Sequence, residues 1–246
     1  AGGKTEEATS SKELQKSFIM IVSLWQYTRR LTSSSLAKIF SVKLEEDVIK
    51  GFSEGICQLK VDKAIKVDLK IIDNGSSNEN LEKIKKLVLN QNFKANIIIH
   101  NNDDYKNIIK QQKNHDTFSN LSSLLKCFEL SKEAKDIVYF IEDDYLHFET
   151  SLDEMIGSFE RISSQIKKDI FVCSSDYPYL YMNNEKTNIL IGNKRHWRTI
   201  SKTLCTFMTS KILLDKYWDN FYKTCLDRND PFEKFLNEMY ETEICI

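Results

Sequence analysis

The chain contains several short runs in which apolar residues, mainly Val and Ile, predominate, and longer segments with helical periodicity separate these runs. The runs occur at Phe18–Leu24, Val67–Asp73, Ala95–His100, Ile137–Ile141 and Ile170–Cys173. A strand that is apolar on both sides must be covered on both sides, which is typical of parallel sheets between layers of helices. The sequence therefore predicts an α/β fold with a mostly parallel central sheet flanked by helices on both faces.

Three segments between these runs carry apolar residues at every third or fourth position, the spacing of one helix face. They are residues 35–63, 78–90 and 118–134. The chain has 7 Gly and 2 Pro in 246 residues, and so few turn signals argue against a many-turned sandwich. We expect residues 17–246 to form one domain, and the polar start, residues 1–16, to be a flexible tail or an expression remnant.

The overall charge is balanced, with 35 Lys and Arg against 36 Asp and Glu. Such a chain has no general attraction to nucleic acid, so an anionic ligand must be held by a local group of residues. The six cysteines include no CxxC pair and predict reduced core residues of a cytoplasmic protein. No apolar run approaches the roughly 18 residues of a membrane-spanning helix, so we expect no transmembrane segment.

Three consecutive acids, Glu142, Asp143 and Asp144, follow the apolar run Ile137–Ile141 directly. Ligands of such sheets bind at the carboxyl ends of the strands, where polar turns gather. Three adjacent carboxylates repel one another, and their partial burial is costly unless a cation compensates. The block therefore predicts a Mg²⁺ or Mn²⁺ site. The alternative is a solvated acidic turn that caps a helix beginning at Ser151.

A second polar group closes the run Val67–Asp73, where Asp73 is followed by Asn74, Gly75 and two serines. The Asn-Gly pair predicts a turn with positive φ, and either serine is a suitable cap for the next helix. Asp73 is thus either a binding residue at a strand end or part of an ordinary turn.

The two strand ends, in this order, resemble the nucleotide-sugar-binding half of the GT-A glycosyltransferases, in particular the inverting family-two-like group. The resemblance implies that residues 17–150 bind a nucleoside-diphosphate sugar and residues 151–246 bind the acceptor. It implies that Asp73 reads the base and that the acidic block is the DxD motif. Within this block, Asp144 is the direct ligand of Mn²⁺ or Mg²⁺. Glu142 is a second metal ligand, acting through water or ribose, and both Glu142 and Asp143 also belong to the nucleotide site.

One departure from the family lies after the first strand, where "SLWQYTRR" replaces the usual Pro-Thr-Tyr-Asn. In this place Trp25 and Tyr27 are candidates to stack on the base, and Arg29 or Arg30 to bind phosphate. Core packing and an exposed helix surface are the alternative roles of these four residues.

The resemblance also implies a carboxylate base at an acidic site before a late helix, where the chain reads "DRNDPFEKF". An inverting transfer needs such a group to accept the proton of the acceptor hydroxyl. Asp230 is the first candidate and Glu233 the second. The alternative for Asp230 is the N-cap of a helix whose first residue is Pro231.

Two further stretches carry binding chemistry. In "VCSSDYPYLYM", Asp176 and Tyr177 suit the apolar ring faces and hydroxyls of a sugar acceptor, unless this is an ordinary packed loop.

In "GNKRHWRT", Arg195 and the next three residues make a basic cluster that predicts a clamp for the diphosphate or a lid over the donor. The alternative is a basic loop with one exposed Trp. The predicted cluster consists of Arg195, His196, Trp197 and Arg198.

Together these features predict a metal-dependent glycosyltransferase that moves a sugar from a nucleoside diphosphate to a glycan or glycolipid acceptor, with inversion. By the resemblance, its setting is polysaccharide biosynthesis in the cytoplasm, with peripheral association at the inner face of the membrane. A nucleotidyltransferase is a weaker alternative, because no Gly-rich loop follows the first strand. A Mg²⁺-dependent phosphotransfer protein is also weaker, since its key Asp follows an early strand and the first strand, "FIMIVSLW", ends without one. A non-catalytic sugar- or nucleotide-binding domain remains as a third alternative, and it predicts weak or metal-independent nucleotide binding.

Overall fold

The computed structural model describes most of the predicted strands and helices. The described residues are 17–24, 54, 56, 65–89, 93–110, 115–143, 145, 147–175, 181–182, 186–202 and 205–246. The helical region predicted over residues 35–63 lies outside them apart from residues 54 and 56, which are helical. The candidates Trp25, Tyr27, Arg29, Arg30, Asp144, Asp176 and Tyr177 also lie outside the described residues.

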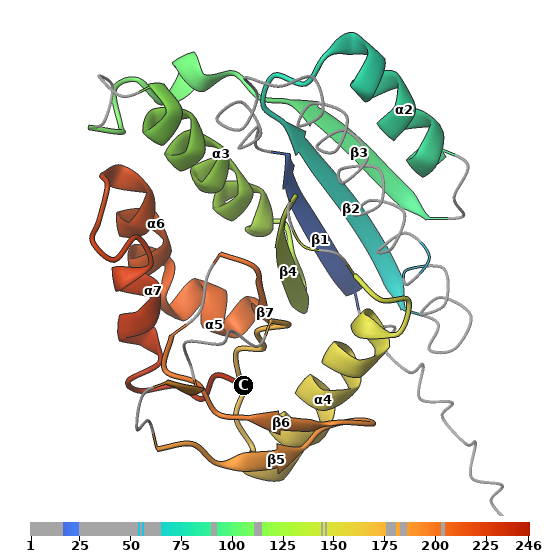
Figure 1. Cartoon of the computed structure of the whole chain (residues 1–246), viewed down its shortest axis with the longest axis vertical. Helices are drawn as coiled ribbons and strands as arrows, with labels where there is room; N and C mark the ends of the chain where they lie inside the picture. The colour runs from blue at the N-terminus through green and yellow to red at the C-terminus, as the bar shows by residue number, and fades with distance from the viewer. Residues whose placement is uncertain are drawn as a thin grey trace, which may run out of the picture.

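A five-stranded sheet forms the centre of the molecule, with the strand order β3-β2-β1-β4-β7 (Figure 1). Its strands are β1 (Ser17–Leu24), β2 (Lys66–Asp73), β3 (Lys94–Ile99), β4 (Ile137–Glu142) and β7 (Phe207–Ser210). The first four run parallel, and β7 pairs antiparallel with β4. The predicted mostly parallel sheet is therefore confirmed.

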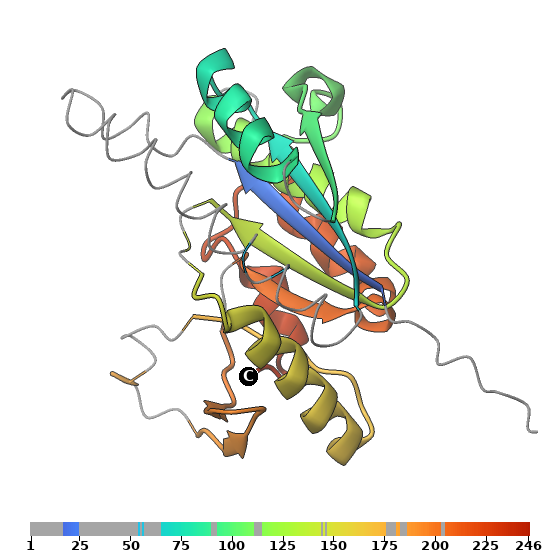
Figure 2. The same ribbon diagram turned by 90° about the vertical axis from the view of Figure 1, so that its right-hand side faces the viewer.

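Helices cover both faces of this sheet, as Figure 2 shows from the side. The helices are α2 (Asn78–Leu89), α3 (His115–Ser131), α4 (Ser151–Ile166), α5 (Lys211–Lys216), α6 (Trp218–Leu226) and α7 (Lys234–Met239), with a short 3-10 helix η2 (Asn102–Tyr105). Helices α2 and α4 pack on one face. Helices α3, α5, α6 and α7 pack on the other. The fold is thus α/β with a Rossmann-like arrangement, as predicted.

The central strand β1 explains why the apolar runs do not alternate with polar residues. Phe18, Met20 and Val22 enter the core beneath α2 and α4. Ile19 and Ile21 enter the core beneath α3. All five are at most 6% exposed, because strand neighbours lie on both sides and helices on both faces.

The run Ile170–Cys173 differs from its prediction as a strand. Only isolated bridges form there, from Phe171 to Cys245 and from Val172 to Met208. The physical reason is that the segments on either side of this run, the short β7 and the last residues of the chain, are too short to form a longer strand ladder with it. The backbone N–H of Phe171 donates to the carbonyl of Ile244 and that of Val172 to the carbonyl of Met208, both at 2.9 Å.

The sheet has one topological switch point. The chain moves outward from β1 to β2 and β3, and then returns to place β4 on the other side of β1. Ser23 of β1 is paired in register with Glu142 of β4, so both strands end at the same edge. Ligands of open α/β sheets bind in the crevice at this point. The acidic block follows the strand at this crevice.

A separate two-stranded hairpin, β5 (Ile189–Ile191) and β6 (His196–Arg198), lies beside α4 at the lower edge of the molecule in Figure 1. The predicted basic cluster occupies its turn and second strand. No helix among the described residues is long and apolar enough to cross a membrane. All five described cysteines are buried, as predicted for core residues.

A cluster of phenylalanines joins β7 to the helices on its face. The Phe207 ring lies 5.1 Å from that of Phe140 and stacks on that of Phe221 at 5.9 Å, measured between ring centroids. Phe207 is fully buried. Since it follows Thr206, which contacts Glu142, its packing also fixes the segment beside the acidic block.

We predict that Phe207→Ala lowers the free energy of unfolding by about 3–5 kcal/mol, because the cavity left among the neighbouring rings cannot close. Urea unfolding followed by fluorescence measures the change. Phe148→Ala is the matched control: this ring is 79% exposed, so the change should stay within about 0.5 kcal/mol. Equal effects of the two substitutions would contradict the packing described here.

Candidate active site

The acidic block begins at the last residue of β4, and its first side chain is held by a hydrogen-bonded threonine. The backbone N–H of Glu142 donates to Oγ1 of Thr206 at 3.0 Å. The Thr206 hydroxyl in turn donates to Oε2 of Glu142 at 3.2 Å. Both Glu142 and Asp143 are partly exposed at the edge of the sheet. The structure therefore brings two of the three predicted acids to the switch point in an accessible position.

Asp73, the predicted reader of the base, closes β2 and is only 2% exposed. Its carboxylate accepts hydrogen bonds from the backbone N–H of Ser76 at 3.1 Å and of Gly75 at 3.4 Å. Gly75 has φ +97°, a conformation that glycine adopts without strain. The predicted turn is thus present, and Ser77 caps α2 by accepting from the N–H of Asn80 at 3.2 Å. The role of Asp73 in reading a base stays a prediction.

A network of polar side chains lies behind this turn, and the sequence interpretation missed it. Asn74 donates through Nδ2 to Oγ of Ser119 at 2.8 Å and of Ser123 at 2.6 Å. His100, at the end of β3, contacts Oγ of Ser122 at 3.0 Å. Burial, followed by the charge of a nearby lysine, lowers the pKa of His100, which favours the neutral ring. The sequence contained one pattern from which this network could have been predicted. Several serines occur on α3, a helix that is otherwise largely apolar where it faces the core.

His147, five residues after Glu142 in the chain, contacts a residue of β4. Nε2 of His147 lies 2.7 Å from the hydroxyl of Tyr139, and this hydroxyl lies 3.1 Å from Oγ of Ser174. Nδ1 of His147 lies 3.0 Å from the carbonyl of Tyr145. Burial lowers the pKa of His147, so the neutral tautomer that donates from Nδ1 to this carbonyl fits the site. These contacts connect the acidic end of β4 to the segment that contains Ser174.

Ser174 also lines a cavity of about 590 Å³. The predicted residues Arg195, His196, Trp197 and Arg198 all line it, together with Tyr181. The guanidinium carbon of Arg198 lies 4.1 Å from the centre of the Tyr181 ring. Cys173 lines the same cavity, and its thiol contacts the carbonyl of Thr206 at 3.8 Å. The basic cluster therefore lines a cavity whose wall residue Cys173 contacts Thr206, the residue that holds Glu142.

A buried glutamate holds the turn of the basic hairpin against α4. Glu154 is 5% exposed and accepts the backbone N–H of Lys194 at 2.7 Å and of Arg195 at 3.1 Å. It also accepts the indole N–H of Trp197 at 2.9 Å and the hydroxyl of Ser158 at 3.0 Å. Trp197 is partly buried as a result, so the alternative of a loop with an exposed Trp is wrong.

The hydrogen bonds around Glu154 also determine whether its carboxyl group is ionised. Burial alone would raise the pKa of this carboxyl, but the donors from Trp197, Lys194, Ser158 and Arg195 outweigh burial and hold the pKa below its ordinary value. Glu154 is therefore ionised at neutral pH. The sequence interpretation missed this residue, although an acid among the inward-facing apolar residues of α4 was a usable signal.

The contact between α4 and the hairpin requires two glycines. A Cβ atom on Gly157 would lie 2.5 Å from Cγ of Asn193, and one on Gly192 would lie 2.3 Å from Oγ of Ser158. Both distances are far below van der Waals contact, so neither position has room for a side chain. The hairpin therefore sits closely on α4 at one defined place.

The two candidates for the base lie in different surroundings. Asp230 is exposed and borders a polar cavity of about 460 Å³ with Asp116 and Arg228. It is not a helix N-cap, because residues 231–233 form a turn and α7 begins at Lys234; that alternative was wrong. Glu233 is partly buried, and burial raises its pKa.

The charges of Glu142 and Glu233 both act on the thiol of Cys205, which directly precedes Thr206. Burial raises the pKa of this thiol well above its ordinary value, and the two carboxylates add to the increase, Glu142 more than Glu233.

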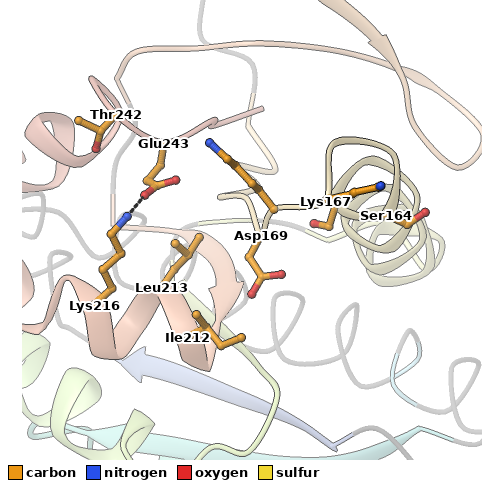
Figure 3. Close-up of a pocket in the computed structure, with 10 residues that line it drawn as sticks. Ser164, Lys167, Asp169, Ile212, Leu213, Lys216, Thr242 and Glu243 are labelled. Carbon is orange, nitrogen blue, oxygen red and sulfur yellow. Dashed lines mark hydrogen bonds and ion pairs between the residues drawn. The ribbon is translucent and has the colours of Figure 1, made fainter.

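A further cavity of about 700 Å³ lies at the other end of β4, where Ile137 pairs with Ser210 at the start of α5. Figure 3 shows its charged residues, among them Lys167, Asp169 and the ion pair of Lys216 with Glu243. It contains none of the predicted site residues.

No protein-family model and no curated protein matches the chain. Among solved structures, the crystal structure of S. aureus TarS 1-349 is similar, with 13% sequence identity and a TM-score of 0.43. The similarity covers 81% of this chain and 48% of that chain, so this chain spans about half of its length. A likeness this distant says nothing about substrate or reaction. The functional proposal below therefore rests on the residues of this chain.

We predict that Glu154→Gln lowers the free energy of unfolding by about 1–3 kcal/mol, because the amide cannot replace the charged acceptor of four donors. The folded-state pKa of Glu154 is depressed, so its contribution is complete above the unfolded-state pKa of about 4.3 and is lost as the pH falls through the folded-state value. The difference between wild type and variant should therefore be constant near neutral pH and shrink below about pH 4. Urea unfolding at several pH values measures it.

Glu79→Gln is the matched control, since Glu79 is exposed on α2 and its ion pair with Lys83 spans 3.3 Å. Its effect should stay below about 0.5 kcal/mol. A Glu154→Gln effect as small as this would contradict the role of the carboxylate in holding the hairpin.

Proposed function

We propose that this protein is a metal-dependent glycosyltransferase that moves a sugar from a nucleoside-diphosphate donor to a glycan or glycolipid acceptor, with inversion. The observation that carries the proposal is the position of the acidic block. Glu142 and Asp143 lie partly exposed at the switch point of the sheet. A cavity lined by Arg195, His196 and Arg198 is linked to Glu142 by two contacts, from Cys173 in its wall to Thr206 and from Thr206 to Glu142. A site for a diphosphate needs both features, a metal site and nearby cations.

The acidic residues fit Mn²⁺ or Mg²⁺ by their chemistry. Carboxylate oxygens are the ligands these ions prefer, and proteins often supply one or two carboxylates while substrate phosphates and water complete the coordination. Among the described residues, no three His, Cys, Asp or Glu side chains come together as a metal-binding group. This is compatible with a site in which Asp144, Glu142 and the donor phosphates share the ion. When bound, the ion would stabilise the negative charge of the departing diphosphate.

The basic cavity would bind the negative charge of the substrates that the metal ion does not neutralise. Arg195 and His196 are exposed and line this cavity, so an anionic group can reach them. Glu154 fixes the backbone of the turn at Lys194 and Arg195. His196 directly follows this fixed turn. We propose that Arg195, His196 and Arg198 bind the diphosphate or an anionic part of the acceptor. Trp197 would position them, because its indole is bonded to Glu154.

We propose Glu233 as the base, in preference to Asp230. In an inverting transfer, the acceptor oxygen forms a bond to the anomeric carbon, the bond from that carbon to the diphosphate breaks, and a carboxylate takes the hydroxyl proton. A base works best when its pKa lies near the working pH, and burial raises the pKa of Glu233 in that direction.

Nucleotide binding tests the metal site first. We expect UDP or GDP to bind in isothermal titration calorimetry only when Mn²⁺ is present, and we expect Asp143→Ala and Asp144→Ala each to abolish this binding. Asp219→Ala, on the exposed side of α6, is the control and should bind like the wild type. Metal-independent binding would favour a non-catalytic binding domain. Absence of binding to any nucleotide, or unchanged binding in both acidic variants, would refute the proposal.

Turnover separates the two candidate bases. With the sugar nucleotide that binds, we expect Glu233→Gln to lower kcat by about 10²–10⁴ while metal-dependent nucleotide binding persists, because only proton transfer is lost. Asp230→Asn should change kcat little. In the wild type, kcat should fall with decreasing pH above the ordinary carboxyl pKa of about 4.3, since a raised pKa leaves Glu233 protonated there. Inactivation by Asp230→Asn alone would instead identify Asp230 as the base.

A further inference from the structure

Strand β3 is the outermost strand of the sheet on the side of α2, as Figure 1 shows. It pairs with β2 over its whole length without a bulge, from Lys94 opposite Asp68 to Ile99 opposite Asp73. Among the described residues, no strand pairs with the side of β3 that faces away from β2. We call this side the β3 edge.

The β3 edge lacks the usual protection of an outer strand. At the other end of the sheet, the short β7 is covered, because Val172 and Met208 exchange backbone hydrogen bonds at 2.9 and 2.8 Å. Proteins protect longer edges with a proline, a bulge or a charged residue along the strand. The six residues of β3 include one charge, Lys94 at its start, and its amine lies 2.7 Å from the carboxylate of Asp68 in β2.

The hydrogen bond at the end of β3 shows which backbone groups point to the β3 edge. The N–H of His100 donates to the carbonyl of Asp73 in β2 at 2.7 Å. Since the backbone groups of successive strand residues point to opposite sides, Ala95, Ile97 and Ile99 direct their N–H and C=O groups away from β2. These groups are therefore in position to pair with a further strand.

The side chains of the same three residues fit a strand of the same sequence in the opposite direction. Ala95 and Ile97 pack on the core at the face that α2 covers. Ile99 lies on this face as well, yet it is 64% exposed. An antiparallel copy of β3 centred on Ile97 would place each Ile99 opposite an Ala95. The exposed large side chain would thus lie beside a small one.

Helix α2 carries opposite charges toward its two ends. Glu79 and Glu82 are exposed near its start, and Lys85 and Lys86 follow them in its second half. A two-fold axis through the β3 edge reverses the direction of α2 in the second copy. The acidic start of each α2 then faces the basic end of the other, so the charges of the two copies are complementary.

We propose that the β3 edge is the contact between two copies of this chain. Each β3 runs antiparallel to the other about a two-fold axis at Ile97, and Ala95 pairs with Ile99 of the partner subunit. The two sheets thereby become one continuous sheet. Because the axis reverses the strands, the acidic ends of β4 in the two copies point in opposite directions. The proposal does not rest on the proposed catalytic function, since it involves neither nucleotide nor metal.

Light scattering and hydrogen exchange of the full chain test the proposal. We expect twice the mass of one chain at high protein concentration and a fall toward the mass of one chain on dilution. The N–H groups of Ile97 and Ile99 should exchange slowly in the dimer and faster on dilution, because the partner strand protects them. A single-chain mass throughout the micromolar range would overturn the proposal. So would equally slow exchange in the monomer, which would assign the β3 edge to another segment of the same chain.

One substitution locates the contact. Ile99→Lys should raise the dissociation constant of the dimer at least about tenfold, because two apolar side chains of the interface are replaced by charged ones. Ile212→Lys is the matched control: this isoleucine is 71% exposed on α5, so the same charge is added away from the β3 edge. Its dissociation constant should equal that of the wild type. Equal effects of the two substitutions would contradict the proposal.

Charge reversal on α2 tests the antiparallel arrangement. Glu79→Lys/Glu82→Lys makes the charges of this helix all basic, and Lys85→Glu/Lys86→Glu makes them mainly acidic. We expect each double variant alone to dimerise at least about fivefold more weakly than the wild type, and a mixture of the two to form a mixed dimer. A mixture that associates no better than its components would contradict the proposal. Thermal unfolding checks that both are folded, and little change is expected because the ion pairs of Glu79 and Glu82 are exposed.

Discussion

Burial of β1 on all sides is the constraint on which the rest of the structure depends. Its neighbours β2 and β4 occupy both edges, and helices cover both faces, so its side chains have no access to water except at its end. Polar chemistry is thereby confined to the strand ends. The carboxyl ends of β1 and β4 form the switch point, and the acids lie there because few other places in the sheet accept charge.

A second constraint acts through a single carboxylate. Burying Glu154 without partners would be costly, and the β5–β6 hairpin supplies three donors to it, while the hydroxyl of Ser158 on α4 supplies a fourth. The consequence extends beyond stability. Because the donors are the backbone of Lys194 and Arg195 rather than their charged ends, the turn is fixed while the exposed Arg195 side chain keeps access to a ligand. In this way the buried Glu154 fixes the position of a basic turn without forming an ion pair with the Arg195 guanidinium.

The sequence predicted the parts of the fold that depend on local pattern. The apolar runs identified β1, β2, β3 and β4 to within about a residue, because strands buried on both faces leave a continuous signal. The turn after β2 was readable from Asn74 and Gly75. The short β7 and the β5–β6 hairpin were missed as strands, because segments of three or four residues carry too little periodicity. The roles of Glu154 and Thr206 depend on partners about 40 and 64 residues away in the chain, which no local pattern contains.

The direction of β7 explains how distant segments meet at one edge of the sheet. Because β7 is antiparallel to β4, its first residue pairs with Phe140 near the end of β4, and its last pairs with Ile137 at the start. The residues just before β7, Cys205 and Thr206, must therefore lie at the carboxyl edge beside Glu142. The chain runs from the basic hairpin, which is held on α4, into these residues. A parallel β7 would instead have placed Cys205 and Thr206 at the opposite end of the sheet, away from Glu142.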